Sequence, residues 1–147
     1  MTGIIDDTIV EVDETVIVTL TIITAGDAGF TIDAANDDAT INILDNDTAT
    51  VSIANSGDAA ETSTVAGEFT LTMTSASESA TVVSYNVSGS ATPGAGGDYT
   101  TLSGTVTGPL GATTATIDVT GIIDDSIVED DETVIVTLTG TDNGLIG

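Results

Sequence analysis

The stretch TGIIDDTIVEVDETVIVTL (Thr2–Leu20) occurs again as TGIIDDSIVEDDETVIVTL (Thr120–Leu138), and the copies differ only at residues 8 and 12 of the first. In each copy, acidic residues lead directly into TVIVTL, where apolar and polar residues alternate. Alternation with a period of two is typical of a β-strand that buries one face. The repeat therefore predicts a recurring unit in which an acidic loop precedes a half-buried strand.

The same alternation continues through most of the chain. EFTLTMT (Glu68–Thr74) places three apolar residues on one face and threonines on the other. Further strands are expected at residues 39–44, 48–53, 81–87, 104–107 and 115–119. Clusters such as NSGDAA and SGSATPGAGGD, whose residues are typical of turns, separate them. No segment has a sustained helical period, so the sequence predicts an all-β fold, an immunoglobulin-like antiparallel β-sandwich.

Composition limits the possible partners. All charged side chains are acidic: the 147 residues include 24 Asp and Glu, no Lys, Arg or His, and carry a formal net charge of −24. Nucleic acids and anionic membrane surfaces are excluded, because no cationic side chain can meet a phosphate. No apolar run approaches the roughly 20 residues of a membrane-spanning helix, so membrane insertion is not expected. The absence of Cys removes disulfides and thiolate metal sites.

Most of the acids gather where strands are expected to begin or end. Two carboxylates about 4 Å apart repel by roughly 4 kcal/mol at an effective dielectric of 20. Without basic residues, only solvent, protons or bound cations can relieve this repulsion. Ca²⁺ accepts six to eight oxygen ligands from flexible loops, whereas zinc and copper usually require His or Cys. The acidic clusters therefore favour calcium binding, and the alternative is a merely solvated acidic surface. The first cluster is Asp6, Asp7, Glu11, Asp13 and Glu14, the second is Asp124, Asp125, Glu129, Asp130, Asp131 and Glu132, and the third is Asp37, Asp38, Asp45 and Asp47.

Two adjacent runs, GSATPGAGGDYTTLSGTV (Gly89–Val106) and ATIDVTGIIDDSIVEDDETVIVTL (Ala115–Leu138), resemble the Calx-β domain. This family is the calcium-binding sandwich of sodium–calcium exchangers, integrin β4 and many large bacterial surface proteins. Ser90 stands where Thr is usual, and Val134 where Phe is common. The resemblance implies that residues 48–147 form a nearly complete domain without its last strand. It implies that residues 1–47 are the closing strands of a preceding copy.

The resemblance also implies the calcium ligands. A cluster at one end of the second domain would use Glu61, Asp98, Asp124, Asp125, Glu129 and Glu132. The preceding copy would use Asp6, Asp7, Glu11, Glu14, Asp45 and Asp47. Each set lacks some of the family's acids within this chain, so the resemblance fixes the location of each site better than its occupancy.

These features predict a structural and interaction protein rather than an enzyme, since open acidic clusters do not form the cleft that a catalytic acid needs. We expect a calcium-stiffened module of an extracellular or cell-surface filament or adhesin, with neighbouring copies of the same repeat as partners. The alternative is a calcium-dependent module that binds a glycan or a protein. The chain is expected to come from a longer array, or else residues 39–44 complete the sandwich of a neighbouring chain by head-to-tail strand addition.

Overall fold

The computed structural model describes residues 3–126, 128, 130–144 and 146. Within them the chain forms strands and no helix, so the predicted all-β fold is confirmed, and no helix there could span a membrane. The strands are β1 (Glu14–Thr19), β2 (Asp38–Ile43), β3 (Val51–Gly57), β4 (Gly67–Met73), β5 (Thr81–Gly89), β6 (Thr105–Gly108), β7 (Thr114–Val119) and β8 (Val134–Thr141).

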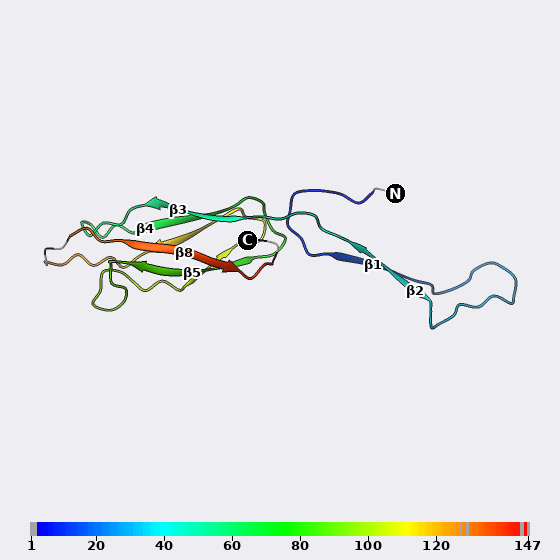
Figure 1. The fold of residues 1–147 in the computed structure, drawn as a ribbon. Coiled ribbons are helices and arrows are strands. Elements are labelled where there is room, and N and C mark those ends of the chain that lie inside the picture. The colour runs from blue at the N-terminus through cyan, green and yellow to red at the C-terminus, as the bar shows by residue number, and fades with distance from the viewer. Residues whose placement is uncertain (1–2, 127, 129, 145, 147) are drawn as a thin grey trace. The chain divides into compact units, whose positions relative to one another are not determined.

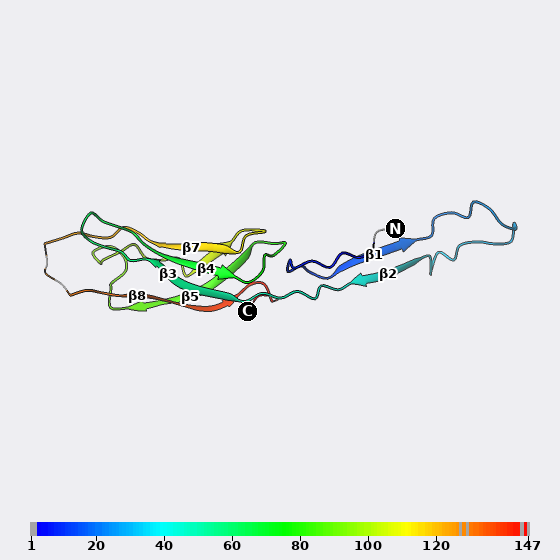
Figure 2. The ribbon, with the colours of Figure 1, turned by 90° about the horizontal axis from the view of Figure 1, so that it is seen from above.

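The chain divides into two compact units. Met1–Val10 and Asp47–Gly147 form one, called here the sandwich unit, and Glu11–Asn46 form the other, the hairpin unit. The sandwich unit has two antiparallel sheets, with strand orders β3-β4-β7 and β6-β5-β8. Figure 1 shows these sheets as two facing layers, and Figure 2, seen from above, shows β7, β4 and β3 next to one another. Between them lies a core of buried side chains, Leu71, Val83, Tyr85, Ile117 and Val136.

Period-two patterning explains which side chains reach this core. In β4, Leu71 and Met73 are buried while Thr72 between them is exposed, as the alternation predicts. One expected turn is different: the first three residues of NSGDAA extend β3 to Gly57. The strand continues because a register shift between Asn55 and Gly57 accommodates one extra residue, Ser56, whose hydroxyl donates to the Glu68 carbonyl (3.1 Å).

The strands end in two sets of loops. The described residues of the tip are loops 58–66 and 90–104 with residues 120–126, 128 and 130–133, and those of the base are loops 74–80 and 109–113 with residues 142–144 and 146. A second core cluster closes the base, formed by Val10, Ala49, Met73 and Ile146. The backbone of Val10 is fixed there: its N–H donates to Ala76 (2.9 Å), and its carbonyl accepts the N–H of Glu78 (3.0 Å).

The hairpin unit is one pair of antiparallel strands. β1 and β2 pair in a continuous register from Glu14↔Ile43 to Thr19↔Asp38. Its apolar side chains, including Val16, Val18 and Ile41, remain exposed. Within this unit, the described residues include no second sheet that could cover them.

Candidate metal centre

The tip contains a pocket of about 110 Å³ lined by acidic side chains from three separate loops. Glu61 comes from loop 58–66, Asp98 from loop 90–104, and Glu132 from the approach to β8. Apolar and aromatic side chains form the rest of the lining, among them Tyr99, Val119, Ile122 and Val134. Three of the predicted ligands thus line one pocket although they are far apart in sequence.

Glu61 lies in a tight turn. Ala60 and Val65 exchange backbone hydrogen bonds of 3.0 and 2.7 Å, and the N–H of Thr64 donates to the Glu61 carbonyl (2.7 Å). Ser63 and Thr64 both have positive φ, of 69° and 49°, which brings the chain back within a few residues. The backbone of Glu61 is therefore fixed by local hydrogen bonds.

Asp98 is held by reciprocal bonds with Thr92. The Thr92 N–H donates to Asp98 Oδ2 (2.6 Å), and the Asp98 N–H donates to the Thr92 carbonyl (2.7 Å). A Cβ at Gly97 would overlap the Thr92 carbonyl oxygen, so only glycine fits beside this clamp. The carboxylate of Asp98 is oriented before any ligand arrives.

Backbone bonds also bring the second acidic run to the same end. The N–H of Ile123 donates to the Asp98 carbonyl (3.1 Å), which places Asp124 and Asp125 directly after a residue tied to Asp98. Asp124 and Asp125 are exposed and do not line the pocket. The predicted ligand Glu129 lies outside the described residues.

Glu132 is positioned by the start of β8. The Thr133 N–H donates to Ser90 Oγ (2.9 Å), and the Thr133 carbonyl accepts the Ala91 N–H (3.1 Å). Gly89 has φ of 128°, and a Cβ there would overlap the Thr133 carbonyl oxygen. Glycine at position 89 therefore allows β8 to approach loop 90–104, which brings Glu132 to the pocket.

The donor set at the tip consists of carboxylates, which suits a hard cation such as Ca²⁺. The chain has no Lys, Arg or His to neutralise these carboxylates. Among the described residues, however, no three acidic side chains converge closely enough to hold a metal ion. The residue types fit calcium, while the carboxylates of Glu61, Asp98 and Glu132 stand around the pocket without closing on a common point.

The first acidic cluster is divided between the two units. In the hairpin unit, the Glu11 N–H donates to Asp45 Oδ2 (2.9 Å), and the Asp45 N–H donates to Asp13 Oδ1 (3.1 Å). Glu14 opens β1 opposite Ile43. The structure thus brings Glu11, Asp13 and Asp45 together, although Asp13 was not among the expected ligands. The remaining predicted ligands belong to the sandwich unit, namely Asp6, Asp7 and Asp47.

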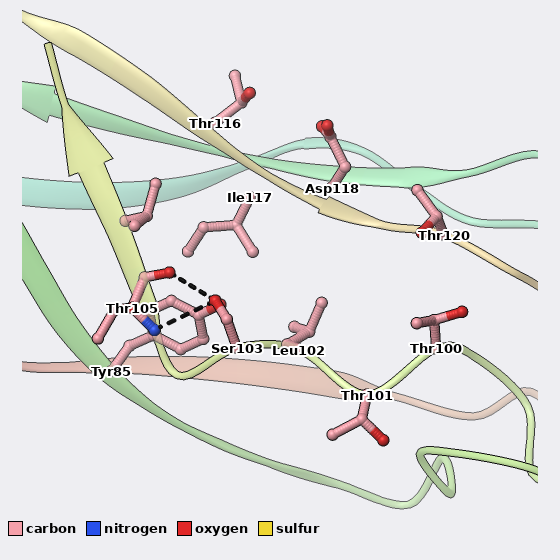
Figure 3. A pocket seen from close by; sticks show the side chains of 11 residues that line it. Tyr85, Thr100, Thr101, Leu102, Ser103, Thr105, Thr116, Ile117, Asp118 and Thr120 are labelled. Atoms are coloured by element: carbon pink, nitrogen blue, oxygen red, sulfur yellow. Dashed lines mark hydrogen bonds between the residues drawn. The ribbon is translucent and has the colours of Figure 1, made fainter.

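A larger pocket of about 290 Å³ lies at the edge of the sandwich, where β6 and β7 belong to different sheets. Figure 3 shows Thr100, Thr101, Ser103 and Thr120 around it, with Asp118 as its acidic side chain. A single carboxylate is a poor metal site, whereas clustered hydroxyls can hydrogen-bond a polar ligand. Threonine and serine are so frequent in this chain that their occurrence does not indicate this pocket.

Sequence reasoning also missed the role of Val10 at the base. A signal was present, because Ile9 and Val10 form an apolar pair inside an acidic run, and such a pair is unusual in a solvated loop. In the structure Val10 is 1% exposed. The acidic segment therefore carries an apolar anchor as well as candidate ligands.

Comparison with protein families gives a match for both copies. The model of the Calx-beta domain matches residues 2–47 and, separately, residues 45–145. A search of curated proteins and a search of solved structures found no match for this chain. The resemblance inferred from the acidic and aliphatic motifs is confirmed by the two family matches.

Proposed function

The chain belongs to the Calx-beta domain family, and on this basis we propose that it is a structural calcium-binding module of an extracellular or cell-surface array. Domains of this family are non-catalytic, bind calcium and occur in extracellular or surface regions. The proposal extends these properties to an adhesin or filament in which calcium fixes the loops of successive copies.

The observation that carries the proposal is the tip pocket. Glu61, Asp98 and Glu132 reach it from three loops, in a chain with no cationic side chain. These residues, together with the loop acids Asp124, Asp125 and Glu129, are the proposed ligands. A bound Ca²⁺ would neutralise part of their charge and link the loops that carry them.

The first cluster is the proposed counterpart in the preceding copy. Glu11 and Asp45 are already joined by a backbone-to-carboxylate hydrogen bond at the open end of the hairpin. Neighbouring copies of the repeat are the proposed partners, by tandem connection or by strand addition of β2 to another copy. In either arrangement the acidic loops lie beside the strands that connect one copy to the next.

Thermal unfolding in chelator and in millimolar calcium tests the proposal. Tyrosine fluorescence reports on the sandwich unit, because both tyrosines lie in it. A ligand at one hundred times its Kd stabilises the folded state by about 2.7 kcal/mol. For a domain of this size the midpoint should rise by roughly 10 °C or more. The double variant Asp124→Asn with Asp125→Asn should lose most of this rise.

A matched control is the double variant Asp37→Asn with Asp38→Asn, which removes the same charge from the hairpin unit. It should keep the calcium response of the unmodified chain. An equal midpoint rise with NaCl at the same ionic strength would instead mean that calcium only screens the acidic surface.

The alternative function is a calcium-dependent module that binds a glycan or protein. The hydroxyl-lined pocket of Figure 3 is the surface that favours it, since threonine hydroxyls can both donate to and accept from sugar hydroxyls. The two pockets share no lining residue, which separates the two functions: substitutions at Thr101 and Ser103 would impair glycan binding and leave the calcium response intact.

A further inference from the structure

Two valines in nearly identical sequence have opposite environments. Val10 ends the sequence GIIDDTIV and is 1% exposed, whereas Val128 ends GIIDDSIV and is 99% exposed. Val128 is therefore an apolar side chain that its own loop leaves exposed to solvent. Its counterpart shows what such a residue can do when a suitable surface is present.

The surface that receives Val10 is well defined. It consists of Ala49, Met73 and Ile146, together with the loop residues Ala76, Ser77 and Glu78 that pair with Val10, and is called here the socket. Val10 pairs with Ser77 in a parallel bridge, and Ser77 Oγ donates to the Val10 carbonyl (3.2 Å). The bonds from Val10 to Ala76 and from Glu78 to Val10 are made by the backbone. Any segment with the same backbone course and a valine could therefore make these contacts.

The strands that follow the two valines show a second contrast. ETVIVT at residues 14–19 forms β1 and pairs with β2. The same six residues recur at 132–137, where Val134–Thr137 begin β8. In the sheet order β6-β5-β8, the described residues of β8 pair with β5 along one edge only. Among the described residues, the other edge of β8 is free to pair, and the residues that begin β8 have the same sequence as those that pair with β2 in the hairpin unit.

We propose that residues 120–138 of one copy of this chain take the place of residues 2–20 of a second copy. Val128 then occupies the second copy's socket, and β8 pairs with the second copy's β2. The observed register transfers directly: Val16↔Ile41 and Val18↔Ala39 become Val134↔Ile41 and Val136↔Ala39. This inference deepens the proposed array by specifying the partner and the contact.

The exchange leaves the buried contacts of Val10 unchanged in kind, because a valine replaces a valine. The two positions at which the segments differ are exposed in the first copy, at Thr8 and Val12, so Ser126 and Asp130 replace no buried group. The inserting segment at the tip and the receiving socket at the base are different surfaces. Contacts of this kind are head-to-tail and can propagate from copy to copy.

Cysteine cross-linking tests the contact, since the chain has no native cysteine. One variant carries Ser77→Cys in the socket and Val10→Ser to weaken the resident anchor. It is mixed with a second chain carrying Val128→Cys, under mild oxidation by oxidised glutathione. We expect a disulfide-linked heterodimer, and severalfold less of it when Val10 is intact, because Val10 and Val128 compete for the socket.

The matched control replaces Val128→Cys with Val65→Cys, which places the thiol on another exposed valine of the tip. A single chain carrying both Val10→Cys and Ser77→Cys calibrates the socket, because bridge partners are close enough for a disulfide. The proposal is overturned if Val128→Cys cross-links no better than Val65→Cys, or if the calibrating chain fails to close. Should Val10→Ser prevent folding, the same comparison is made with Val10 intact.

Calcium titration of the Val128→Ser chain by calorimetry separates this inference from the proposed function. A heterodimer without calcium binding would refute the calcium module and leave the contact. Calcium binding without a heterodimer would refute the contact alone.

Discussion

Tyr99 shows how the acidic tip affects a single side chain. It is buried beside Asp98 and lines the tip pocket. Burial raises the pKa of the Tyr99 phenol above its ordinary value, and the charge of Asp98 raises it further. Both causes act against the phenolate, which would place a second negative charge in a poorly solvated position.

Alkaline pH should therefore destabilise the sandwich unit. Above the ordinary tyrosine pKa of about 10, the unfolded chain loses the Tyr99 proton before the folded chain does. The folded state then binds more protons, so this contribution to stability is complete below pH of about 10 and falls as pH rises through the raised pKa. Urea unfolding in chelator between pH 8 and pH 11 should show a steeper loss for the unmodified chain than for Tyr99→Phe.

The chain is well suited to this measurement, because it contains no Lys, Arg or Cys and only two tyrosines. Asp98→Asn should give an intermediate slope, since it removes the second cause and leaves the burial. Equal slopes for the unmodified chain and Tyr99→Phe would show that the phenol is solvated in the folded state.

The repeated hexapeptide ETVIVT separates the effect of sequence from the effect of packing at the level of one strand. Val136 in β8 is 9% exposed, while its counterpart Val18 in β1 is 59% exposed. The two valines have the same local sequence and both lie in antiparallel strands. Their difference in burial comes from the second sheet, which covers β8 and is absent from the hairpin unit.

Truncation of these valines should have unequal effects. Val136→Ala removes two methyl groups from the core and should cost about 2 kcal/mol of unfolding free energy, including the cavity that remains. Val18→Ala should change stability by less than about 0.5 kcal/mol, as exposed substitutions usually do. Urea unfolding followed by circular dichroism measures both, and equal costs would mean that the exposed face of β1 is covered in solution.

Strand positions could be predicted from the sequence because period-two patterning depends on local residues alone. The extension of β3 through Asn55–Gly57 was missed, since it depends on pairing with β4 and a bulge, against the turn preference of Asn, Ser and Gly. The difference in burial between Val10 and Val128 could not be predicted from the local sequence pattern either. Their flanking sequences are nearly the same, and only the presence of the socket distinguishes them.

The tip was predictable in part. Family resemblance identified Glu61, Asp98 and Glu132 as acids of one site, and the structure places all three around one pocket. It could not give the distances between the carboxylates, because loop closure depends on the hydrogen bonds of Thr92, Ser90 and Thr133. The hydrogen bonds that hold Asp98 depend on how loop 90–104 folds back on itself, and no single residue of the sequence indicates that fold.

Charge governs association at the scale of the whole molecule. Each copy carries a formal net charge of −24, so two copies repel at any separation shorter than the screening length. The segment 120–138 contains both Val128, which is proposed to enter the socket of a second copy, and the densest acidic run. Apolar docking and electrostatic repulsion therefore act on the same loop in opposite directions.

Self-association of the Val10→Ser chain should consequently strengthen with salt. Raising NaCl from about 0.01 M to 0.15 M shortens the screening length from about 30 Å to about 8 Å, which removes most long-range repulsion. Calcium at constant ionic strength should strengthen association further, because its proposed ligands flank Val128. By linkage, association then raises calcium affinity by the same factor. Sedimentation velocity gives the association, and calorimetry at two protein concentrations gives the affinity. The same series with Val128→Ser added should show no association at any salt concentration. Association that weakened with NaCl would require contacts between opposite charges, which a chain without Lys, Arg or His side chains cannot supply.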